Sequence, residues 1–137
     1  MNTNLRFAIS IHALTLLASS NDLLTSEAIA MSVHTNPVVV RRTMASLREH
    51  GLVESKPGAN GGWRLLRDPG QIRLCEVFRS LESEEVLAIH SNPDKYCRVG
   101  GHIRETLSSI FTFAQQEMEN ALDRYTIADV LDDVLAR

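Results

Sequence analysis

The chain has 137 residues, which is enough for one domain with its own hydrophobic core and short for two. Hydrophobic residues make up 44% and charged residues 23%, a composition that is ordinary for a soluble globular protein and argues against extensive disorder. The net charge of −3 excludes a chain that is basic throughout, and two cysteines are too few for a disulfide framework or a four-thiolate zinc site.

The N-terminal apolar stretch predicts a buried helix from Leu5 to Ala18, because its apolar side chains recur at helical spacing. Part of this stretch, Phe7–Ala18, also resembles the apolar region of a secretory signal. His12 interrupts that region, however, and only Arg6 supplies a basic charge before it. The stretch is too short to span a bilayer. We therefore expect a cytoplasmic protein that has no membrane partner.

Two short helices joined by a turn are predicted next. Thr25 is a suitable N-cap for the first, and Asn36 followed by Pro37 opens the second. The second helix has apolar residues one turn apart: Val40, Met44 and Leu47. Its three consecutive valines locally favour a strand, but the helical spacing and the glycine at Gly51 favour a helix that ends there. Two helices joined in this way indicate a helix-turn-helix.

After Gly51 the spacing of the apolar residues changes from helical to alternating. Leu52–Lys56 and Trp63–Arg67 predict two strands, and the glycine-rich loop Pro57–Gly62 joins them. A strand hairpin directly after a helix-turn-helix is typical of a wing, although a plain hairpin turn is the alternative. The loop lacks the Gly-Lys-Ser/Thr ending of a nucleotide-binding P-loop, so we do not expect phosphate-transfer chemistry.

The C-terminal half predicts a short helix, Leu74–Leu81, then a loop, then a long amphipathic helix from about Arg98 to Tyr125. Thr126 and Asp129 have the spacing of a capping box that opens a last helix. The predicted fold class is mainly α with a small β wing, a winged helix-turn-helix plus a long dimerisation helix. We divide it into a DNA-binding domain (1–82), a loop or sensor segment (83–97), and the dimerisation and C-terminal helices (98–137).

Charge is distributed unevenly along this chain. Residues 33–73 carry a balance of +4, whereas residues 74–137 carry −6. Such asymmetry is typical of a protein in which one face meets an anionic partner. The outward side of the third helix and the wing offer donors for base edges and phosphates. The candidate DNA-binding residues are Thr35, Asn36, Val38, Arg41, Arg42, Lys56, Asn60 and Arg64. An ordinary solvated face is the alternative for the arginine pair.

Four motifs occur in a fixed order: LTSExIA at 24–30, NPxxVRR at 36–42, LRxxGLVxS at 47–55 and GGWRL at 61–65. Together they resemble the Rrf2 family of bacterial transcription regulators, and the likeness extends over nearly the whole chain. The resemblance implies a homodimer with a winged helix-turn-helix in each subunit, the long helix at the dimer interface, and a palindromic operator in double-stranded DNA.

The candidate sensing segment departs from the family's pattern. Cluster-binding members have three cysteines before the dimerisation helix, whereas this stretch contains only Cys97, so we expect no iron–sulfur cluster and no metal. Cys97 lies at the predicted start of the long helix beside Arg98. There the helix dipole and a cation favour the thiolate, which is the form that reacts with oxidants. An inert, partly buried cysteine is the open alternative. Cys75 is expected to be inert in the core.

These patterns predict a sequence-specific DNA-binding transcription regulator, a repressor, that acts as a homodimer and responds to redox or thiol chemistry through Cys97. The third helix would read the major groove and the wing would reach the flanking minor groove. The alternative is a winged-helix protein–protein interaction module that does not bind DNA, with the acidic C-terminal half facing a protein. No metalloprotease, serine hydrolase or dinucleotide fingerprint supports an enzyme.

Overall fold

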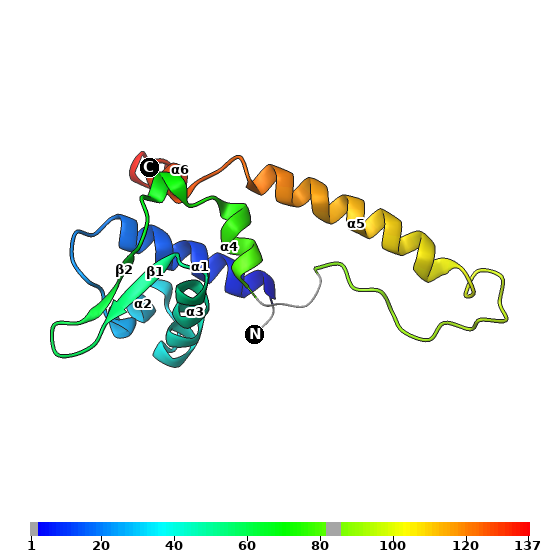
Figure 1. The fold of residues 1–137 in the computed structure, drawn as a ribbon, viewed down its shortest axis with the longest axis horizontal. Helices are drawn as coiled ribbons and strands as arrows, with labels where there is room; N and C mark the ends of the chain where they lie inside the picture. The colour runs from blue at the N-terminus through cyan, green and yellow to red at the C-terminus, as the bar shows by residue number, and fades with distance from the viewer. Residues whose placement is uncertain (1–2, 82–85) are drawn as a thin grey trace.

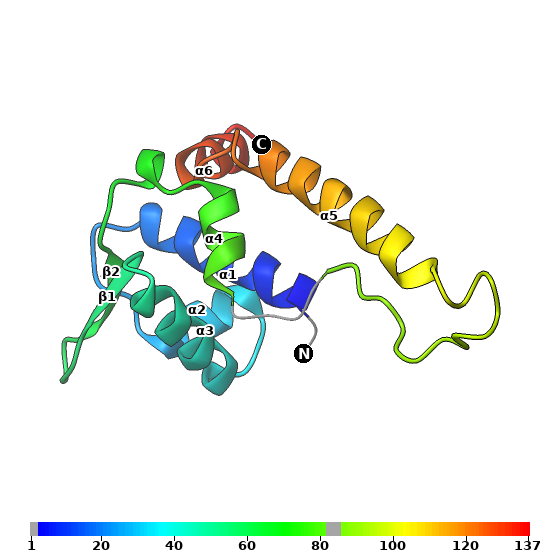
Figure 2. The same ribbon diagram turned by 45° about the vertical axis from the view of Figure 1, so that its right-hand side comes forward.

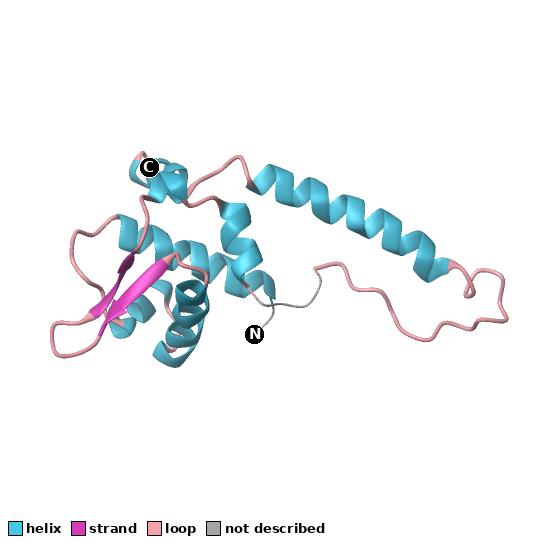
Figure 3. Cartoon of the chain, in the orientation of Figure 1, coloured by secondary structure: helices cyan, strands magenta, loops and turns pink. Residues whose placement is uncertain are grey.

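The computed structural model describes residues 3–81 and 86–137 as a mostly helical chain with one small sheet (Figures 1 and 3). The elements in chain order are α1 (Thr3–Ala18), α2 (Ser26–Val33), α3 (Pro37–Glu49), β1 (Val53–Lys56), β2 (Gly62–Leu65), the short 3-10 helix η1 (Pro69–Gln71), α4 (Leu74–Ser80), α5 (Ile103–Leu122) and α6 (Ile127–Leu135). The predicted fold class is confirmed.

The helix-turn-helix forms where its capping residues predict it. The Thr25 hydroxyl accepts a hydrogen bond from the backbone N–H of Ala28 at 3.0 Å, which caps α2. The Asn36 side chain accepts one from the N–H of Val38 at 2.8 Å and caps α3. Both bonds satisfy donors that the first helical turn leaves without partners.

Helix α3 ends as the glycine at Gly51 predicts. Gly51 has a φ of +73°, a conformation that costs other residues energy. Its N–H donates to the carbonyl of Arg48 at 3.0 Å, and the N–H of Leu52 donates to the carbonyl of Leu47 at 3.1 Å. This pair of bonds is a Schellman motif. It turns the chain directly into β1.

The hydrophobic core lies between α1, α2, α3 and the base of the wing. Its larger fully buried side chains are Leu14, Ile29, Val40, Met44, Leu47, Leu52, Val53, Ile72, Val77 and Ile127. The last of these belongs to α6, which packs along α1 and follows the predicted capping box of Thr126 and Asp129. Packing therefore joins α6 to the N-terminal part of the chain, although the predicted division groups it with the dimerisation helix. The predicted boundary between residues 82 and 83 lies outside the described residues.

The wing is a two-stranded antiparallel hairpin in which Val53 pairs with Leu65. Its strands are slightly shorter than predicted. Leu24 extends the pairing on the other edge of β2, because the N–H and carbonyl of Trp63 both bond to the backbone of Leu24, at 2.8 and 3.1 Å. Gly62 has a φ of +148°, and a Cβ there would lie 2.6 Å from the Leu24 carbonyl oxygen. Only glycine allows this close approach.

Helix α5 projects away from the rest of the chain, as both ribbon views show (Figures 1 and 2). It is shorter than the predicted Arg98–Tyr125 at both ends. The chain before it folds back so tightly that a Cβ at Gly100 would lie 2.3 Å from the Asp94 carbonyl oxygen. After it, the Tyr125 carbonyl accepts a hydrogen bond from the N–H of Leu74 instead of continuing the helix. None of the 20 residues of α5 is buried.

Candidate nucleic-acid interface

Helix α3 presents one polar face to solvent. Its inner face buries Val40, Thr43, Met44 and Leu47. On the opposite face Val38, Arg41 and Arg42 are exposed, as predicted. Thr35 is half-buried in the turn before the helix. Asn36 is exposed, but its side-chain oxygen is already engaged as the N-cap, so its amide N–H₂ group is what remains free to donate.

Arg41 is held by an ion pair that periodicity does not reveal. Its Nη2 atom lies 2.6 Å from Oε1 of Glu27, near the start of α2, and the two side chains are 52% and 63% exposed. The pKa of the Glu27 carboxyl is lowered, first by its own backbone N–H and then by the Arg41 guanidinium. The carboxylate therefore holds the guanidinium beside the N-terminal end of α2.

Three wing residues of the predicted site are exposed: Lys56 at the end of β1, Asn60 in the tip and Arg64 on β2. Among the residues that the structure describes, Lys56 forms no ion pair. Arg64 lies directly across the ladder from Glu54 and forms an ion pair with it. Its charge is thus partly neutralised within the wing. Lys56 and Asn60 are the wing groups left open toward a partner.

Trp63 fastens the wing to the helix-turn-helix. Its ring is buried, and Nε1 donates a hydrogen bond to the Ser26 hydroxyl of α2 at 3.0 Å. The Arg48 guanidinium lies 5.4 Å from the centre of the Trp63 ring and donates to the hydroxyl of Ser55 on β1 at 3.0 Å. The wing and α3 consequently lie side by side in both views (Figures 1 and 2). Trp63 thus packs against partners that come from distant positions in the sequence.

Cys97 lies in a turn before α5, not at the start of a helix. Since α5 begins at Ile103, the prediction that the helix dipole acidifies this thiol is wrong. The pKa of the Cys97 thiol is nevertheless lowered, first by the backbone N–H of Gly100 and then by that of Val99. The thiol is exposed. Cys75 is buried as expected, and its pKa is raised mainly by desolvation.

The donor groups do not fit an iron–sulfur cluster. Within residues 3–81 and 86–137, no three His, Cys, Asp or Glu side chains converge in a way that could hold a metal ion. Cys75 lies in α4 and Cys97 in the separate loop before α5. A cluster needs about four ligands, mostly thiolates. In the same part of the chain, every helix is too short or too polar to cross a membrane.

Comparisons with known proteins agree with this geometry. A family model described as Rrf2, iron-dependent transcriptional regulator, matches residues 3–133. YwnA of Bacillus subtilis, whose name describes an HTH-type transcriptional regulator, is 41% identical over 130 residues, which cover 94% of this chain and 96% of that protein. A crystal structure described as a DNA-binding protein has 37% identity and a TM-score of 0.76, covering 92% and 98% of the two chains. Another, described as a transcriptional regulator from Lactobacillus plantarum, has 26% identity and a TM-score of 0.79, covering 95% and 89%.

Proposed function

The chain belongs to the Rrf2 family of DNA-binding transcription regulators, which are not enzymes, and from this membership we propose that it binds a palindromic operator as a homodimer. The observation that carries the proposal is the exposed face of α3 beside a wing that is fixed to it. In this arrangement α3 of each subunit enters a major groove and the wing reaches the flanking minor groove. A dimer bound over a promoter excludes polymerase, so we assign it the role of a cytoplasmic repressor.

The candidate residues divide between base edges and phosphates. Val38 and Arg41 on the open face of α3 suit base edges, where a methyl contact and a bidentate guanidinium discriminate between sequences. Arg42 and Lys56 suit phosphates. Thr35 and Asn36 lie at the N-terminal end of α3, where the helix dipole favours an anion. Asn60 at the wing tip reaches the minor groove, and Arg64 supports the wing through Glu54.

The test is a double substitution of Arg41→Ala and Arg42→Ala, with Arg124→Ala as the matched control. Arg124 lies just after α5, far along the chain from α3 and the wing. Binding is measured against the DNA upstream of the protein's own gene at several salt concentrations. We expect the double variant to lose sequence-specific binding and the control to keep it. Undiminished, still specific binding by the double variant would contradict the roles given to these two residues.

The homodimer is supported by apolar surface that the described chain leaves open. Ile110 and Phe113 on α5 are 55% and 68% exposed, although both lie on a helix that is amphipathic in sequence. An exposed apolar helix face of this length marks an interface. A two-fold axis would let α5 of each subunit cover the other.

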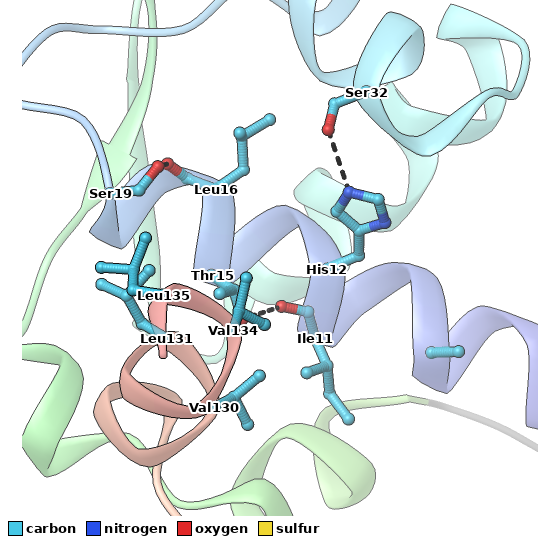
Figure 4. A pocket seen from close by; sticks show the side chains of 11 residues that line it. Ile11, His12, Thr15, Leu16, Ser19, Ser32, Val130, Leu131, Val134 and Leu135 are labelled. Atoms are coloured by element: carbon cyan, nitrogen blue, oxygen red, sulfur yellow. Dashed lines mark hydrogen bonds between the residues drawn. The ribbon is translucent and has the colours of Figure 1, made fainter. Parts of the chain in front are cut away.

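A second open apolar surface is the groove between α1 and α6, with a volume of about 640 Å³. Figure 4 shows Ile11 and Leu16 of α1 on one side and Val130 and Val134 of α6 on the other. A hydrogen bond of 2.9 Å between His12 and Ser32 closes one end toward α2. No described residue of α5 lines this groove. The exposed apolar face of α5 is convex, whereas the groove is concave and apolar. These shapes suit a dimer in which α5 of one copy fills the groove of the other.

Cys97 is the proposed thiol sensor. Its exposed thiol and lowered pKa favour the thiolate that reacts with oxidants. The test compares operator binding by the wild type and a Cys97→Ser variant before and after mild peroxide treatment. We expect oxidation to change the affinity of the wild type alone. An equal response in the variant would exclude Cys97 as the sensor.

The donor set leads us to expect a regulator that works without an iron–sulfur cluster, although the family model is described as iron-dependent. Anaerobically purified protein should be colourless and contain no stoichiometric iron. A visible charge-transfer spectrum with bound iron would contradict this expectation.

A further inference from the structure

A pair of arginines lies on the side of α3 that faces α1. Arg6, near the start of α1, and Arg42, in the middle of α3, line one shallow concavity of about 240 Å³. Val39 and the buried Thr43 complete its lining. The two arginines are 36 positions apart in the sequence, so no helical or strand periodicity connects them. None of the described residues that line it is acidic.

Among the residues that the structure describes, the guanidinium groups of Arg6 and Arg42 have no partner. Neither forms an ion pair or a hydrogen bond with any of them. Arg41, Arg64 and Arg67, by contrast, are each paired with a glutamate. Two like charges that line one concavity repel each other unless an anion lies between them. The planar donors of arginine match the oxygens of a phosphate.

The position of this arginine pair suits a DNA backbone. The wing and the N-terminal end of α1 lie on opposite sides of α3 in both ribbon views (Figures 1 and 2). A helix in the major groove, which is about 12 Å wide, has a phosphate backbone along each side. The wing side faces one of these backbones, and the side with Arg6 faces the other.

We propose that Arg6 and Arg42 together bind a backbone phosphate on the DNA strand opposite the one that the wing follows. This inference rests on the proposed function and adds to it a contact from α1, which lies outside the helix-turn-helix and the wing. Because phosphates are the same in every sequence, the site strengthens binding to all DNA and adds no discrimination. It fixes the depth and tilt at which α3 enters the groove.

The experiment measures the affinity of an Arg6→Gln variant for the operator and for unrelated DNA between about 50 and 200 mM salt. We expect both affinities to fall by the same factor, about 3- to 10-fold. Because a homodimer loses this contact in both subunits, the slope of log affinity against log salt should become shallower by about 1.8, twice the value of about 0.9 for one phosphate contact. The control Arg124→Gln removes the same charge from the other half of the chain and should leave the slope unchanged. Equal melting temperatures show that the variants are folded.

The possible outcomes separate this site from the proposed function. If the wild type binds DNA with a slope that Arg6→Gln does not change, the arginine pair is not a phosphate site. If the wild type binds no DNA at any salt concentration, the proposed function itself fails. Titration of the DNA-free protein with inorganic phosphate tests whether the two arginines bind a small phosphorylated ligand instead of DNA. Tight binding of free phosphate at about 150 mM salt would replace the DNA backbone by a small phosphorylated ligand and overturn the proposal.

Discussion

The Arg41–Glu27 ion pair places a carboxylate at the surface that we propose faces DNA. Near phosphates this carboxylate would be repulsive, yet it pairs with the guanidinium on the open face of α3. On the proposed function, we expect it to lower affinity for DNA in general and to favour sequences that fit the paired guanidinium. No local pattern in the sequence indicates this contact, because Glu27 and Arg41 are 14 positions apart and meet only when α2 and α3 pack.

A Glu27→Gln variant should bind unrelated DNA more tightly and discriminate less between the operator and other sequences. Removal of one negative charge from the interface should raise non-specific affinity about 3- to 10-fold at low salt, where the repulsion between this carboxylate and the phosphates is screened least. Competition binding with operator and non-operator duplexes measures both effects. An unchanged ratio of the two affinities would show that Glu27 does not orient Arg41 on DNA.

The same ion pair predicts little dependence on pH. The pKa of Glu27 lies below its ordinary value of 4.5, so its carboxylate takes up a proton at a lower pH than an ordinary glutamate does. The pair is lost only when the pH falls through the lowered value. Specificity should therefore stay constant from neutral pH down to about pH 5, and the same competition assay checks this. A loss of specificity within that range would point to a different titrating group.

The two cysteines should react at very different rates. Cys97 is exposed and has a lowered pKa, whereas Cys75 is buried and has a raised one. With iodoacetamide at neutral pH we expect one thiol to be alkylated fast, and this fast reaction should be absent in the Cys97→Ser variant. The pH at the midpoint of its rate profile should lie below that of an ordinary thiol. Mass spectrometry of the labelled peptides identifies it. Equal labelling of Cys75 in the folded protein would contradict its burial.

At the scale of elements, capping residues and a helix-ending glycine correctly predicted where α2 and α3 begin and where α3 ends. The caps at Thr25 and Asn36 and the end at Gly51 depend on side chains and backbone groups within a few residues, so the sequence contains their whole cause. After α5, the Tyr125 carbonyl bonds to Leu74, which is distant in the sequence, so no local signal marks that end. Before α5, a tight turn brings Gly100 against Asp94, and the apolar spacing alone does not show this turn. The predicted helix was too long for these two reasons.

Gly62 joins the wing to the start of α2, and a Gly62→Ala variant should be destabilised by about 2–3 kcal/mol. Alanine is strained at a φ of +148°, and its Cβ would lie 2.6 Å from the Leu24 carbonyl oxygen. Urea unfolding followed by the fluorescence of Trp63, the single tryptophan, measures the loss.

Gly70→Ala serves as the matched control, since its nearest contact is the Asp68 Oδ1 atom at 3.2 Å and no unusual φ is required. We expect its stability to change by less than about 1 kcal/mol. Equal destabilisation of the two variants would mean that the contact with Leu24 does not matter.

At the scale of the whole molecule, the exposed α5 predicts that a charge on its open side separates the subunits. In a Phe113→Glu variant the dimer dissociation constant should rise by about 100-fold or more, because an uncompensated carboxylate costs several kcal/mol to bury. Sedimentation velocity measures the assembly state, and operator affinity should fall with it.

The control is Thr112→Glu, which adds the same charge on a polar, exposed position of the same helix. It should leave the assembly state unchanged. A Phe113→Glu protein that remains dimeric would place the interface elsewhere on the chain.

The two backbone hydrogen bonds between Leu24 and Trp63 have a thermodynamic consequence for operator binding. They make the base of the wing, the start of α2 and, through Trp63, the whole helix-turn-helix one preorganised body. The conformational entropy of ordering the wing base is therefore lost during folding and not during association. Binding should show the modest heat-capacity change of rigid docking, without the larger change that accompanies a segment folding onto DNA. A DNA sequence must therefore fit the donors of α3 and the wing as folding has placed them, because the protein surface does not rearrange to meet it.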